Sequence, residues 1–259
     1  ESCRTFQERC TGVSWELDAS RQFLLESTFY LGNLAAFAAD VRRNMREAEE
    51  RGSKYSMTNM RTGLPNAMWL MEDDVDAARR ELGSAMGQWS NDGFHVQHWY
   101  ALLAAAHADL YEGKGEEAFQ RIDERKKRMG RSQLLRVRHI AAVFAYSRAC
   151  AAVASLATQR APELRKKRLA LVAECVKTLE QDSTPWTAAL AGVLGFARRR
   201  FTAEQPSKAD AARIREQLVA ADLGVLVHAF DCLEHGATEG LRAQGVRAPG
   251  RFARMLLPL

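Results

Sequence analysis

Short polar or glycine-bearing breaks between amphipathic segments recur along this chain at a spacing of roughly 40 residues, a period typical of helical solenoids. Three of these breaks begin at Gly32, Glu72 and Gly113. A break of this kind joins two antiparallel helices, and stacked helix pairs bury one continuous core. The pattern predicts an all-α, right-handed helical-repeat solenoid of about five helix pairs, similar to tetratricopeptide (TPR-like) arrays.

The whole chain, residues 1–259, is expected to form a single TPR-like domain. Within it, residues 12–131 should contain three regular helix pairs, and residues 132–236 should contain longer pairs. Residues 237–259 are interrupted by glycines and prolines, and we expect them to form a short irregular C-terminal cap. Such a cap covers the last exposed apolar face of an array.

Capping residues, prolines and apolar periodicity define the expected helices. Their approximate bounds are 14–30, 33–50, 54–70, 74–89, 95–111, 115–129, 133–157, 162–181, 185–201, 206–221 and 223–235. Pro65 lies inside the third of them and should kink or divide it. No segment shows the alternation with period two that is typical of strands, so none is expected.

Large apolar side chains at helical spacing are expected to form the core. Trp15, Trp69 and Trp99 fall on the first helices of successive pairs and should be substantially buried. Phe23 and Leu24 are expected to anchor the first of these helices in the same way.

Charge and cysteine content constrain the setting of the protein. The net charge of +5 is weak evidence for an anionic partner. No apolar run is long enough for a transmembrane helix, and the polar start lacks the pattern of a signal peptide. The five cysteines match no zinc or redox spacing, and free thiols suit a reducing cytoplasm, so we expect a cytoplasmic protein without a membrane partner. Because the chain begins without Met, we expect a fragment of a longer protein.

The segment 93–100 concentrates histidine, amide and aromatic side chains at the start of an expected helix. His95 and His98 are three residues apart, so both can lie on one helical face. A metal site would need a third ligand and outer-shell partners, and no Asp, Glu or Cys nearby supplies them, so no metal is expected. The segment therefore either packs within its repeat or contributes to a binding groove.

The first helix of the next pair carries Arg136 and His139, which can face the same groove because first helices line the concave surface of such arrays. Aromatic residues and Arg are enriched at binding hot spots. Trp99 is expected to point into the core instead. The candidate partner-binding residues are Phe94, His95, Gln97, His98, Tyr100, Arg136 and His139.

Other charged clusters and motifs offer little chemistry. The basic runs at 125–128, 165–168 and 198–200 lack interleaved aromatic residues for base stacking, which favours a solvated surface over nucleic acid or an acidic partner. Carboxylate pairs fall at helix starts, where they compensate the helix dipole. The chain has no phosphate-binding loop, nucleophile elbow, zinc-protease motif or kinase signature. We expect no catalytic residues and no cofactor.

Four groups of segments resemble the C-terminal helical-repeat region of large bacterial serine/threonine protein kinases. They are residues 86–90 with 93–98, 111–115, 132–138, and 241–247 with Pro249 and 251–253. The resemblance extends from about Gly12 to the end and implies a sensory or partner-docking role. The kinase domain of that family is absent here, so no catalytic residue can be carried over.

Together these patterns predict a non-catalytic module that recognises a protein or peptide within a bacterial signalling protein. One alternative is binding of an anionic ligand or nucleic acid through the basic runs. Another is a structural spacer or dimerisation module, since the sequence does not determine the oligomeric state.

Overall fold

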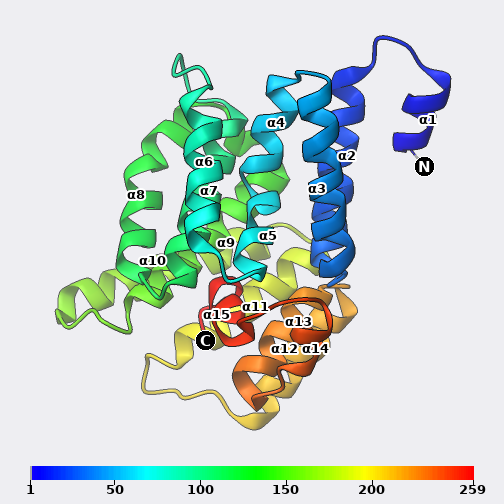
Figure 1. Cartoon of the computed structure of the whole chain (residues 1–259). Coiled ribbons are helices and arrows are strands. Elements are labelled where there is room, and N and C mark those ends of the chain that lie inside the picture. Colours follow the sequence, from blue (N-terminus) through cyan, green and yellow to red (C-terminus); the bar gives the residue numbers. More distant parts are fainter. Residues whose placement is uncertain (1) are drawn as a thin grey trace.

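The computed structural model describes residues 2–259, and this part of the chain contains helices and no strands (Figure 1). The first α-helices are α1 (Ser2–Arg9), α2 (Ser14–Tyr30), α3 (Leu34–Glu50), α4 (Lys54–Arg61), α5 (Ala67–Met71), α6 (Val75–Gly87), α7 (Val96–Tyr111) and α8 (Gly115–Arg131). The others are α9 (Arg138–Ser155), α10 (Pro162–Glu180), α11 (Pro185–Arg199), α12 (Lys208–Ala220), α13 (Gly224–His235), α14 (Glu239–Ala243) and α15 (Pro249–Leu256). Two short 3₁₀ helices, η1 (Leu64–Asn66) and η2 (Leu134–Arg136), interrupt the series.

Local signals set the ends of several helices. The Thr184 hydroxyl accepts a hydrogen bond from the backbone N–H of Thr187 at the start of α11. Ser207 and Asp210 form a reciprocal capping box at the start of α12. Pro162 occupies the first turn of α10, where its missing N–H costs nothing. These helices therefore begin close to their expected positions.

Two expected helices are divided in the structure. Pro65 lies in η1, so the segment expected at 54–70 becomes α4, η1 and α5, which confirms the prediction of a kink or break. The preceding Gly63 has φ +59, and its N–H donates to the Tyr100 carbonyl at 2.9 Å. The helix expected from residue 133 begins only at Arg138, because Gln133 adopts the left-handed conformation and leads into η2. Helix α1 was not expected from the sequence.

From α6 to α13 each α-helix packs against the next one in the sequence. Helices α2 to α8 stand side by side in the upper part of Figure 1, and α11 to α13 lie below them. The predicted all-α class and the sequential packing are therefore confirmed.

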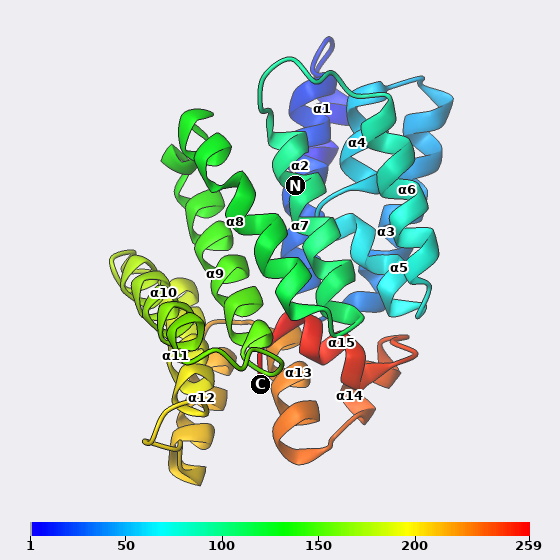
Figure 2. The same ribbon diagram turned by 90° about the vertical axis from the view of Figure 1, so that its left-hand side faces the viewer.

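The C-terminal segment does not act as an end cap. It forms two short helices, as expected, but α15 lies between the upper helices and α13–α14 in both views (Figures 1 and 2). It packs against α7 and α13, and the fully buried Phe252 contacts Phe29 of α2 at a ring-centre distance of 6.4 Å. The Tyr146 hydroxyl donates to the Leu256 carbonyl at 3.0 Å. The segment expected to cover the last repeat instead fills the centre of the molecule.

The two ends of the helix series also touch directly. The turn after α2 meets the start of α13, where the Leu31 carbonyl oxygen lies 2.2 Å from the position that a Cβ atom on Gly224 would occupy. Only glycine permits this approach of two backbones. The helices thus close on themselves, and an open right-handed repeat solenoid is not confirmed.

Of the three tryptophans that were expected to be buried, only Trp99 is fully buried. Trp99 is 2 % exposed and packs edge-to-face against Phe144. Trp69 is half-buried against the core. Trp15 is 63 % exposed, so its predicted burial is wrong. It lies in the first turn of α2, where only the short α1 precedes it.

Candidate binding groove

The segment of histidine and aromatic residues before α7 mainly caps the N-terminus of that helix. The His95 backbone N–H donates to Nδ1 of His98 at 3.0 Å, and Trp89 Nε1 donates to Nδ1 of His95 at 3.3 Å. Phe94 stacks on His98 at 5.4 Å. Burial and the neighbouring His95 and Arg128 lower the pKa of His98. Within residues 2–259, no three potential metal-ligating side chains gather in one place.

Two other candidate residues are poorly placed for a shared site. Gln97 is 2 % exposed, and its amide donates to the Oδ1 atom of Asn59 in α4 at 3.2 Å. A partner cannot reach Gln97 in this conformation, so the prediction that Gln97 binds a partner is wrong. A buried amide of this kind is satisfied by an internal hydrogen bond. Arg136 is exposed in η2 and does not line the groove described next.

Tyr100 and His139 do come together. The His139 ring stacks on Trp186 at 5.5 Å, and its Nε2 atom lies 3.1 Å from Oε2 of Glu26. Tyr100 lines a small cavity that also includes Glu26, Tyr30 and His139. Two of the seven candidate residues therefore border one recess, which is built from α2, α7 and α9.

Glu26, Tyr30 and His139 also line a groove of about 410 Å³ between α2, the first turn of α9, the start of α11 and the turn from α12 to α13. That volume lies within the range of small-ligand pockets, roughly 300–1,000 Å³. The residues that line the groove are Phe23, Glu26, Ser27, Tyr30, Leu31, His139, Trp186, Ala221, Asp222 and Leu223. Hereafter this set is called the α2–α11 groove.

Large apolar side chains remain exposed along the α2–α11 groove. Phe23 is 63 % exposed and Leu31 is 52 % exposed. The prediction that Phe23 and Leu24 anchor α2 in the core is therefore wrong, since Leu24 is also 50 % exposed. The Tyr30 and Trp186 rings meet almost at right angles, 83°, with centres 6.1 Å apart. Exposed apolar side chains that gather in a concavity are typical of an interaction site.

The α2–α11 groove carries negative charge, although the chain as a whole is basic. Glu26 is 9 % exposed and accepts a hydrogen bond from Nε2 of Gln22 at 3.3 Å. Asp222 is exposed on the same lining, and no Lys or Arg belongs to it. Burial, and then the charge of Glu26, raise the pKa values of Tyr30 and Tyr100 above their ordinary range. The groove is therefore aromatic, acidic and rich in hydrogen-bond acceptors.

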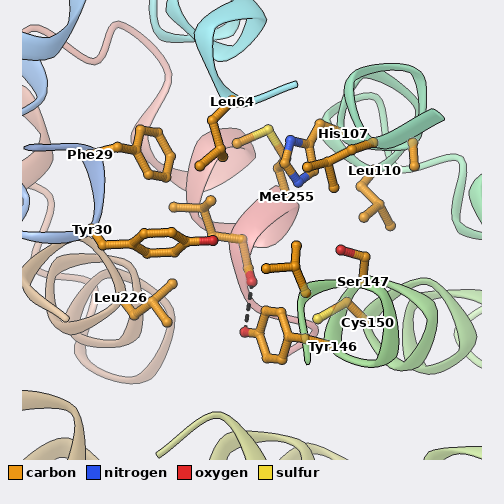
Figure 3. Close-up of a pocket in the computed structure, with 14 residues that line it drawn as sticks. Phe29, Tyr30, Leu64, His107, Leu110, Tyr146, Ser147, Cys150, Leu226 and Met255 are labelled. Atoms are coloured by element: carbon orange, nitrogen blue, oxygen red, sulfur yellow. Dashed lines mark hydrogen bonds between the residues drawn. The ribbon is translucent and has the colours of Figure 1, made fainter. Parts of the chain in front are cut away.

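A separate apolar cavity lies at the centre of the molecule (Figure 3). Phe29 and Tyr30 approach it from α2, while His107 of α7 and Tyr146 of α9 lie on its other sides. Its volume of about 30 Å³ leaves room for about two water molecules, which is too little for a peptide side chain. Burial lowers the pKa of His107 to about 4, and its Nδ1 atom has no hydrogen-bond partner among the described residues. This cavity belongs to the core and not to the groove.

Most cations in two of the basic runs are engaged inside the protein. Arg165 donates to the Leu156 and Gln159 carbonyls, and Arg198 donates to the Leu169 carbonyl. The other internal pairs are Arg168 with Glu116, Arg199 with Asp210, and Arg200 with Glu234. These contacts reduce the number of side chains that could bind phosphates.

Comparison of the chain with family models, curated proteins and solved structures finds no match. Among the described helices, none is long and apolar enough to cross a membrane. The fold and the groove thus define an all-α helical protein whose sequential helices enclose a central C-terminal helix.

Several groove residues were not identified from the sequence as site residues, most clearly Glu26, Leu31 and Trp186. One available signal was the run Phe23, Leu24 and Leu25, since consecutive apolar residues cannot all face the core from one helix. The contribution of Trp186 had no such signal, because α11 reaches the groove only through the tertiary packing.

Proposed function

We propose that this protein is a non-catalytic recognition module that binds a peptide, or a peptide-like segment of a protein, in the α2–α11 groove. The observation that carries the proposal is the exposure of Phe23 and Leu31 along a concave surface with aromatic walls. Hot spots of protein interfaces are commonly aromatic anchors in pockets of this kind. The resemblance to the repeat region of bacterial kinases supports a place in a signalling protein, and the free thiols support a cytoplasmic one.

A peptide suits this groove because its opening combines apolar surface with polar atoms. His139 and Ser27 supply groups that can bond to a peptide backbone, while Phe23 and Leu31 can cover an apolar side chain. A nucleic-acid ligand has less support, because the arginines of two basic runs are engaged internally. These are Arg165, Arg168, Arg198, Arg199 and Arg200. A weak dependence of binding on salt concentration is therefore expected.

The proposal is tested by selecting a displayed library of random peptides on the protein and measuring the affinity of the enriched peptides. Phe23→Ser should weaken binding by about tenfold or more, about 1.4 kcal/mol, because it removes the exposed anchor. Leu24→Ser is the matched control, since Leu24 is also exposed on α2 but does not line the groove. Equal loss in the two variants, or no enriched peptide at all, would rule out the groove as the peptide site.

A further inference from the structure

We infer that the α2–α11 groove selects a cationic side chain, lysine or arginine, from its peptide ligand and holds the cation against Tyr30 and Trp186 beside Glu26. This inference rests on the proposed function, because it names the chemistry of the side chain that the same groove would accept. It follows from three properties of the groove: its charge, its hydrogen-bonding balance and its walls.

Charge complementarity is the first property. Glu26 and Asp222 are the ionisable acids of the lining, and it contains no Lys or Arg. The arginines near this region are paired elsewhere: Arg21 with Glu47, and Arg138 with Asp182. His139 is the one basic group that faces Glu26 in the lining, and its ring is already fixed by stacking. An incoming cation would therefore meet a locally negative surface.

The hydrogen-bonding balance around Glu26 is the second property. Gln22 is 5 % exposed and donates its amide N–H to Glu26, but its own Oε1 atom has no donor among the described residues. The carboxylate has two oxygens and can accept several bonds, yet Gln22 donates only one, and His139 Nε2 lies 3.1 Å from the other oxygen. The surroundings of Glu26 thus contain more acceptors than donors. Ammonium and guanidinium groups are pure donors, so they correct this imbalance.

The walls of the groove are the third property. Tyr30 and Trp186 form a corner with ring planes at 83°, and Phe23 lies exposed on the same lining. A cation within about 6 Å of such ring centres is attracted by their π-electrons, and partial desolvation strengthens the attraction. The aliphatic stem of lysine or arginine can pack on Phe23 and Leu31 while its charge reaches Glu26.

The inference is tested with the same displayed library of random peptides. Peptides enriched on the wild-type protein should contain Lys or Arg at a common position. Replacing that residue in a synthetic peptide by citrulline, or by norleucine for Lys, should weaken binding by about tenfold or more. The Glu26→Gln protein should bind the cationic peptide with a similar loss and should lose most of its preference over the neutral peptide.

Glu50→Gln provides the matched control, since Glu50 is an exposed acid on α3 outside the groove and its substitution changes the net charge equally. If Glu26→Gln disturbs folding, as circular dichroism would show, Asp222→Asn provides a second variant. Asn tolerates the positive φ of Asp222, +54°, and should also reduce the preference for the cationic peptide.

Different failures have different meanings. Enriched peptides that require Phe23 but bind equally well with arginine or citrulline would overturn the cation inference and leave the proposed function standing. Peptides that bind regardless of Phe23 would overturn both. A loss of affinity that is equal in Glu26→Gln and Glu50→Gln would show a general charge effect and would also overturn the inference.

Discussion

His107 shows how the fold changes the chemistry of a single residue. Its ring lies against the central cavity, where Nδ1 has no partner among the described residues, and burial lowers its pKa to about 4. The unfolded chain would bind a proton on this ring near its ordinary pKa of about 6.5. Between these two values the unfolded state binds more protons, so stability must fall as the pH falls.

The expected contribution of His107 is a loss of about 2 kcal/mol in unfolding free energy between about pH 7 and pH 5, and no further loss well below pH 4. Urea unfolding of the wild type and of His107→Leu at both pH values would measure it. The variant removes the titrating ring, so its stability should change less over this interval. Equal changes in the two proteins would mean that the folded ring titrates as it does in water.

Gln97 and Glu26 show that local sequence does not always predict whether a polar side chain is buried. A polar side chain at a helix start suggests exposure, yet Gln97 is buried against Asn59 because α4 and α7 bring the two amides together. The sequence pattern places Glu26 as an ordinary surface acid of an amphipathic helix, yet α2 and α9 enclose it. In each case the partner lies far away in the sequence, and no local pattern reports it.

At the scale of elements, turns and helix starts depend on glycine where backbones meet. Gly224 opens α13 against the Leu31 carbonyl, which leaves no room for a Cβ atom. This contact holds the end of α2 against the start of α13, next to the groove residues Leu31 and Leu223.

Gly224→Ala should destabilise the protein by about 1–3 kcal/mol, because the added methyl group forces two backbone segments apart. Gly83→Ala is the control, since Gly83 lies within α6 with no atom near its Cβ position. That substitution should be neutral or should stabilise by up to about 1 kcal/mol, as expected for glycine in a helix. Thermal unfolding followed by circular dichroism would distinguish the two. A Gly224→Ala protein as stable as the wild type would show that the two helices do not approach this closely.

At the scale of the whole molecule, α15 joins parts of the chain that a linear array would keep apart. Phe252 is fully buried, and its ring lies next to Phe29, although more than two hundred residues separate them in the sequence. The backbone N–H of Arg247 also donates to the Met71 carbonyl at 2.8 Å. A closed arrangement of this kind should unfold as one cooperative unit, whereas an open solenoid could lose its last repeat alone.

Phe252→Ala should cost about 3–5 kcal/mol, the usual range for removing a buried phenylalanine. It should also accelerate amide hydrogen exchange in α7 and α13, because α15 packs against both. Val219→Ala, an exposed position on α12, should change neither. Faster exchange confined to α14 and α15 would contradict the central role of α15.

The sequence by itself determined the elements. Capping residues, prolines and apolar periodicity act within a few residues of one another, so the all-α class and most helix bounds could be predicted, including the division at Pro65. The same signals missed the break at Gln133, which adopts the left-handed conformation just before η2, a short helix that packs against both α8 and α9. Local interactions are encoded locally, and where they dominate the prediction was accurate.

Only the tertiary structure decided where α15 lies and which residues form the groove. The helix periodicity would have served an open array equally well, but the contacts of Phe252 with Phe29, and of Gly224 with Leu31, close the chain on itself. That closure gathers Glu26, His139 and Trp186 from three helices into one surface. Long-range packing depends on the shape and volume of all the side chains together, and no short segment of the sequence carries that information.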